Sequence, residues 1–159
     1  MALVLLMHKA PLTTIHLQSI FTALHQSRDH DDMLFLSMLR LGEMTVNNNP
    51  QLRDFRKIIL CNSFNWVRNN YEFLLPAQKT DTTFEGNCVH ISQIMGTPNP
   101  QPIMRLYLDS RDQLFPLHPQ LWWHNNGSSP THSWFLHHLR QYCPSDIVSK
   151  AILRRMECL

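Results

Sequence analysis

The sequence predicts an α+β fold with N-terminal helices, a small central antiparallel β region and C-terminal helices. Apolar residues recur at helical spacing up to Pro76 and again after Pro130, whereas six of the ten prolines lie in residues 77–130. Because proline interrupts helices, the central region favours short strands and loops. The 159 residues, 43% of them apolar, suffice for one domain. We expect a single domain over 1–159, with a helical subdomain at 13–76, a β and loop region at 77–130 and C-terminal helices at 131–159.

Two helices are expected in the N-terminal part of the chain. The first covers residues 14–27, where apolar residues recur near helical spacing. The second covers residues 33–41 and is apolar on nearly all sides, so it must be buried or covered by a partner. Asp31 or Asp32 is expected to cap this helix, since a carboxylate accepts hydrogen bonds from the free N–H groups of a first turn.

A third, longer helix is expected from residue 50 to residue 70, with an extension toward 75. Asn49 followed by Pro50 is typical of an N-cap and a first helical position. Apolar residues such as Leu52 and Phe55 then repeat at helical spacing, and basic residues lie beside them.

The central region is expected to contain a strand at Cys88–Ile91 and a β-hairpin. In the hairpin, Arg105–Leu108 and Gln113–Leu117 flank a four-residue turn rich in Asp and Ser. The loop His118–Pro130 follows and carries two adjacent tryptophans.

Two helices are expected at the C-terminus. Thr131 or Ser133 is expected to cap the first of them, which contains Trp134 and Leu139. The second begins at Pro144 and carries an apolar stripe.

Composition and charge exclude several classes of protein. Only 16% of the residues are charged, below the roughly 25% of typical soluble proteins. The 14 Lys and Arg against 12 Asp and Glu leave a net charge of +2, too weak by itself to indicate steering toward nucleic acid or a membrane. No apolar run approaches the ~20 residues of a membrane span. The four glycines form no phosphate-binding loop.

The four cysteines include no CxxC pair, and the sequence shows no secretion signal. We therefore expect free, buried thiols in a reducing compartment, either the cytoplasm or the nucleus, and no secretion.

The leading hypothesis is a non-enzymatic protein-interaction or regulatory protein. Trp122 and Trp123 are adjacent in an extended loop, where two neighbouring side chains cannot easily face the same core. The all-apolar helix that carries Phe35, Leu36 and Leu39 needs burial from more than one side. Because tryptophan is the residue most enriched in binding hot spots, and because the apolar helix needs further cover, we expect these five residues to contact another protein. A second copy of the chain also fits this surface.

The composition, poor in Gly and Lys and rich in His, Met and Asn, is similar to that of viral accessory proteins. This compositional resemblance implies a partner among host proteins.

A rival hypothesis is a small metal-dependent or cysteine hydrolase that uses Cys88, His90 and His132. Zinc takes four nitrogen or sulfur ligands in a tetrahedron, and Cys88, His90, His132 and Cys143 are the candidate ligands, although their spacing matches no zinc finger. A cysteine nucleophile would need its thiolate beside an imidazole. Apart from this zinc ion, no cofactor is expected.

A third hypothesis is an RNA-binding protein that uses the expected helix 50–70. Arg53, Arg56, Lys57 and Arg68 give this stretch a local basic excess. Aromatic residues nearby have the type of side chain on which bases stack.

Overall fold

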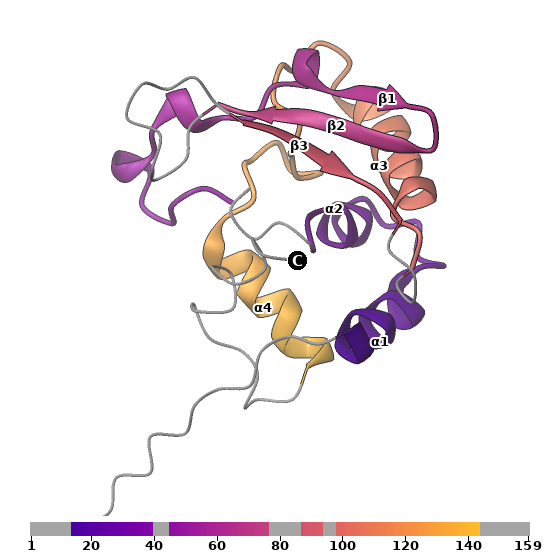
Figure 1. The fold of residues 1–159 in the computed structure, drawn as a ribbon. Coiled ribbons are helices and arrows are strands. Elements are labelled where there is room, and N and C mark those ends of the chain that lie inside the picture. The colour runs from indigo at the N-terminus through magenta and orange to yellow at the C-terminus, as the bar shows by residue number, and fades with distance from the viewer. Residues whose placement is uncertain (1–13, 40–44, 77–86, 94–97, 144–159) are drawn as a thin grey trace, which may run out of the picture.

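The computed structural model describes residues 14–39, 45–76, 87–93 and 98–143, and within these ranges it confirms the α+β class (Figure 1). Four helices and a three-stranded sheet make up the regular structure of the described ranges. The helices are α1 (Thr14–Leu24), α2 (His30–Met38), α3 (Gln101–Leu114) and α4 (His132–Tyr142), and the strands are β1 (Asn65–Val67), β2 (Asn70–Leu75) and β3 (Asn87–Ile91).

The sheet has the order β1-β2-β3, and both pairs are antiparallel. Side chains alternate between its two faces, as the period of a strand requires. Tyr71 and Phe73 of β2 and Ile91 of β3 are buried on the inner face. Glu72 of β2 and His90 of β3 therefore lie on the outer face. Figure 1 shows the inner face over α2 and α3, with α1 and α4 farther from the sheet.

Helix α2 forms the centre of the core. Seven of its nine residues are buried, as expected for a helix that is apolar on nearly all sides. Asp29, rather than Asp31 or Asp32, caps it, because the Asp29 carboxylate accepts hydrogen bonds from the backbone N–H groups of both residues. The sequence prediction therefore placed the start of this helix about one turn too late.

The predicted helix from residue 50 to residue 70 is wrong. The chain instead forms three short 3₁₀ helices, followed by β1 and β2; these are η2 (Pro50–Leu52), η3 (Phe55–Lys57) and η4 (Cys61–Ser63). The side chains of Asn49 and Asp54 each accept a hydrogen bond from the backbone N–H two residues later. Such hydrogen bonds compete with the backbone hydrogen bonds of an α-helix, so a continuous helix does not form and a new short turn begins after each of these two residues. The expected Asn49–Pro50 start is present, but it begins a single 3₁₀ turn.

The predicted hairpin at Arg105–Leu117 is also wrong, since most of this stretch belongs to α3. Proline occupies the N-cap and the second position of the helix, where its missing N–H is tolerated. The buried residues Ile103, Met104, Tyr107 and Arg111 share one helical face. Residues 109–112, whose Asp and Ser side chains are typical of a β-turn, lie near the C-terminal end of this helix instead.

The structure confirms the predictions for three other elements. Helix α1 begins at the expected residue and ends three residues early, and β3 covers the expected strand with one added residue. Thr131 caps α4 by accepting a hydrogen bond from the Trp134 N–H. The helix predicted from Pro144 lies outside the described residues. Within the described ranges, no helix combines the length and the apolar character that crossing a membrane would require.

Buried polar groups join α3 to the segment after it. The Tyr107 hydroxyl donates to the Leu121 carbonyl (2.8 Å) and accepts from the Trp123 N–H (2.9 Å). Arg111, only 2% exposed, donates through Nε to the Gln120 carbonyl (3.0 Å). These bonds satisfy backbone groups of residues 118–123 that would otherwise be buried without partners.

Removing the Tyr107 hydroxyl should destabilise the fold. Tyr107→Phe leaves one buried N–H and one buried carbonyl without this partner, so we expect a loss of about 1–3 kcal/mol of unfolding free energy. The measurement is urea denaturation. Tyr142→Phe, at a half-buried position, is the matched control and should stay within about 0.5 kcal/mol of wild type. Equal effects of the two substitutions would contradict the role assigned to the Tyr107 hydroxyl.

Stability should fall as the pH drops through the titration range of His138. Burial lowers the pKa of His138 below its usual value of 6.5, an effect that Asp32 partly offsets. The unfolded chain therefore binds this proton at a higher pH than the folded chain does. The unfolding free energy consequently decreases as the pH falls from about 6.5 through the lower folded pKa.

Urea denaturation on both sides of pH 6.5 measures this slope. His138→Gln should reduce it. His137→Gln is the matched control, because His137 is exposed on the same helix. A slope that is the same in wild type and His138→Gln would show that His138 does not contribute.

Candidate functional site

The outer face of the sheet brings together a carboxylate, a thiol and an imidazole. Glu72 lies on β2 directly opposite His90 of β3, and Cys88 precedes His90 by two residues, so all three side chains share this face. His90 Nδ1 is 2.9 Å from Glu72 Oε2. One ligand atom from each residue lies within 4.8 Å of the other two. We call Glu72, Cys88 and His90 the sheet cluster.

The sheet cluster is open to solvent, and its electrostatics keep the thiol protonated. Cys88 and His90 are exposed, and Glu72 is half-buried. Desolvation raises the pKa of the Cys88 thiol, and so do the negative charge of Glu72 and a hydrogen bond to its carboxylate. A reactive cysteine needs the opposite, a positive neighbour that stabilises the thiolate. This arrangement therefore does not activate Cys88 as a nucleophile.

The sheet cluster contains two of the four predicted zinc ligands. His132 is the first residue of α4, where its Nδ1 bonds with the Thr45 hydroxyl, and Cys143 is the buried C-cap of the same helix. Neither residue belongs to the cluster, within the part of the chain that the structure describes. The sequence analysis missed Glu72, because it predicted a helix rather than a strand up to that position.

The adjacent tryptophans point into different surroundings. Trp122 is 4% exposed and packs against Phe73 and Tyr107 in the core. Trp123 is half-buried and stacks on His118, with 3.8 Å between the ring centroids. Trp122 therefore offers no surface to a partner in this fold, and Trp123 offers part of one face.

The predicted partner residues of α2 are also part of the core. Phe35 is fully buried and packs against Trp134 and Phe135 of α4. The all-apolar sequence of this helix predicts burial from more than one side, and α1, α3 and α4 of the same chain provide that burial. The predicted contact surface is therefore wrong for four of its residues, which belong to the core: Phe35, Leu36, Leu39 and Trp122.

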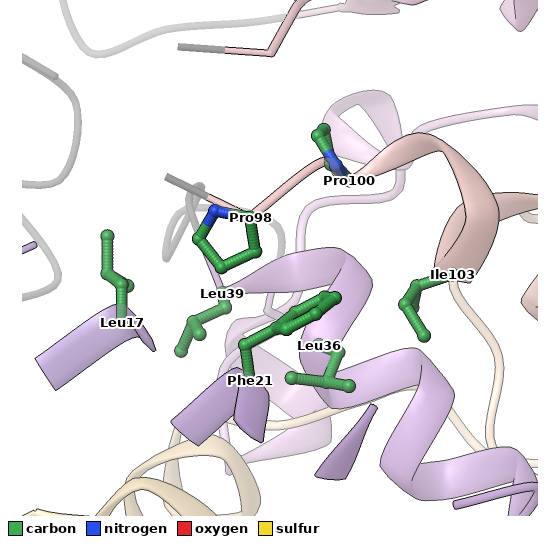
Figure 2. A pocket seen from close by; sticks show the side chains of 7 residues that line it. All are labelled: Leu17, Phe21, Leu36, Leu39, Pro98, Pro100 and Ile103. Carbon is green, nitrogen blue, oxygen red and sulfur yellow. The ribbon is translucent and has the colours of Figure 1, made fainter. Parts of the chain in front are cut away.

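Leu36 and Leu39 line a small apolar pocket between α1, α2 and the start of α3. Figure 2 shows its lining, which is Leu17, Phe21, Leu36, Leu39, Pro98, Pro100 and Ile103. Its volume is about 30 Å³. A ligand site typically measures roughly 300–1,000 Å³, so this pocket is too small for an organic substrate or cofactor.

Among the described residues, two of the four most exposed large apolar side chains lie on η2 and η3. Leu52 is 67% exposed and Phe55 is 77% exposed. We call residues 50–57 the double turn. Its backbone is held by the Asn49 and Asp54 side chains and by a hydrogen bond from Arg53 Nε to the Asn47 carbonyl (2.9 Å).

The predicted basic helix face does not form, because residues 50–70 are not a helix. Arg53, Arg56 and Lys57 belong to the double turn, whereas Arg68 lies in the turn between β1 and β2. Figure 1 shows that turn at the opposite end of the sheet from η2 and η3. The repeated Asn and Asp caps, five residues apart, are the signal that could have shown the interrupted chain from sequence.

Comparison with known proteins gave no match to a family model, a curated protein or a solved structure. The functional interpretation therefore depends on the residues of this chain and their arrangement.

Glu72 should slow the reaction of Cys88 with a thiol reagent. Glu72→Gln removes the negative charge and changes the hydrogen-bond partner of the thiol, so the pKa of Cys88 falls and labelling at neutral pH becomes faster. The rate of disulfide exchange with a chromogenic reagent measures the labelling of Cys88. All the proteins compared carry Ser in place of Cys158. Asp109→Asn, at an exposed position on α3, is the control. Equal rates for wild type and Glu72→Gln would contradict the role of Glu72.

Proposed function

We propose that this chain is a non-catalytic protein-interaction protein and that the double turn contacts its partner. The observation that carries the proposal is the exposure of Phe55 and Leu52, 77% and 67%, on a segment whose backbone is held by its own hydrogen bonds.

Burial of these two side chains favours association. Moving a Leu or Phe side chain from water into an apolar environment is worth about 1.5–3 kcal/mol. Because the Asn49 and Asp54 caps already order the backbone, little further ordering of this segment opposes binding. A segment that is ordered by its caps and exposes two large apolar side chains is therefore suited to contact a partner.

The charges around the apolar pair define the chemistry of the partner. The double turn carries three basic residues and one acidic residue. Arg56 is held by Asp54 through bonds of 3.0 Å and 2.9 Å, which fix the direction of its guanidinium. The partner that fits is a protein surface with an apolar recess and carboxylates around it, since such charges steer encounter and select the orientation.

We favour a protein partner over RNA for this surface. Base stacking uses exposed aromatic rings beside basic residues, and Phe55 is one such ring, but Leu52 beside it offers no face for a base. The other two aromatic residues near the basic residues in sequence are less available, because the Arg105 guanidinium lies 4.0 Å from the ring centroid of Trp66 and Tyr71 is buried. The compositional similarity to viral accessory proteins involves no particular residue, and the host-protein interpretation stays a prediction.

Site-specific photo-crosslinking in cells tests the proposal. A benzophenone amino acid at position 55 should give one discrete crosslinked product with another protein. The same probe at position 117 is the matched control, because Leu117 is 96% exposed and lies outside the double turn. Replacing both Arg56 and Lys57 by Glu should remove the product at position 55, since the partner is expected to be acidic.

Two results would contradict the proposal. One is equal crosslinking at positions 55 and 117, and the other is a product that survives the double charge reversal. A product of twice 18.7 kDa would identify a second copy of the chain as the occupant instead. Phe55→Ser should change the unfolding free energy by less than about 0.5 kcal/mol, which separates lost binding from lost folding.

A further inference from the structure

We infer that Glu72, Cys88 and His90 form a zinc-binding site on the outer face of the sheet. This site is independent of the double turn and of the interaction proposed for it.

The geometry of the sheet cluster needs only small side-chain adjustments to hold the ion. Zinc binds sulfur at about 2.3 Å and nitrogen or oxygen at about 2.0–2.2 Å, so the ligand atoms of a tetrahedral site are roughly 3.5 Å apart. The three ligand atoms already lie within 4.8 Å of one another. The adjustment falls on the side chains, which can rotate about their χ bonds while the strands hold the backbone.

The strands hold the ligands at fixed positions. Glu72 and His90 are cross-strand neighbours, and Cys88 is on the same strand and face as His90. Their Cα atoms are therefore set by the hydrogen-bonded ladder between β2 and β3. Sites built on strands are more precise than sites built on loops. The Glu72–His90 contact of 2.9 Å further keeps two of the ligands together.

The donor atoms select the metal. Zinc displaces the proton of the Cys88 thiol as it binds, and the resulting thiolate and the His90 imidazole suit zinc, whereas magnesium and calcium take oxygen ligands almost exclusively. Three protein ligands leave the fourth tetrahedral position to a water molecule. Cys88 and His90 are exposed, so the ion enters directly from solvent.

Cobalt(II) is the appropriate spectroscopic probe, because it takes the place of zinc and reports a bound thiolate through a charge-transfer band. The reduced full-length chain should bind one equivalent of cobalt and show this band, and added zinc should displace the cobalt. Competition between zinc and a chromogenic chelator then gives the affinity. Inductively coupled plasma analysis after dialysis gives the stoichiometry.

Substitutions in the cluster distinguish this site from adventitious binding elsewhere on the chain. Cys88→Ser should abolish the charge-transfer band. Glu72→Gln and His90→Ala should each weaken zinc binding by about tenfold or more. Cys61→Ser and His137→Ala are the matched controls, one a half-buried cysteine and the other an exposed histidine outside the cluster, and both should bind as wild type does.

The absence of a charge-transfer band at one equivalent of cobalt would overturn the inference. A band that persists in Cys88→Ser, or zinc affinity that is unchanged in both Glu72→Gln and His90→Ala, would also overturn it. Because Cys88 and His90 are exposed, these substitutions should leave the urea midpoint close to that of wild type. The crosslinking result at position 55 has no bearing on this experiment.

Discussion

The enclosure of α2 is the constraint on which the rest of the structure depends. This helix is apolar on nearly all sides, so no single neighbour covers it, and seven of its nine residues are buried. Helices α1, α3 and α4 surround it, although α3 and α4 lie far away in the sequence. The other helices of the chain therefore supply the apolar cover that α2 alone would need from a partner. The exposed side chains that we propose as partner contacts, Leu52 and Phe55, lie away from this core.

The same enclosure requires polar groups inside the molecule. Leu121 and Trp122, in the segment that follows α3, are buried in the core, and the backbone groups around them need partners. Tyr107, Arg111 and His30 supply them, the last through a bond of 2.8 Å to the Trp123 carbonyl. These bonds position the backbone on either side of Trp122, whose indole packs against the rings of Phe73 and Tyr107. Trp122, one of the two adjacent indoles expected to contact a partner, is thus fixed in the interior by hydrogen bonds that its neighbours make.

Local signals in the sequence were reliable where one element depended on its own residues. The caps at Asn49 and Thr131, the burial of α2 and the strand of β3 were all predictable on these grounds. The helix α3 was not, because Asp and Ser suggest a turn until tertiary packing buries Tyr107 and Arg111 on one face. In the sheet cluster, Cys88 and His90 could be named from sequence. Their juxtaposition with Glu72 depends on the pairing of β2 with β3, which spacing along the chain does not reveal.

The hydrogen bonds that hold the double turn are local. Its caps and the bond from Arg53 to Asn47 join residues that are at most six positions apart in the sequence. Leu52 and Phe55 face solvent and lie outside the core. The outward side chains of this segment can consequently be exchanged with little energetic effect on the core. If the double turn binds a partner as we propose, its specificity can change without compensating changes around α2, and the architecture stays the same.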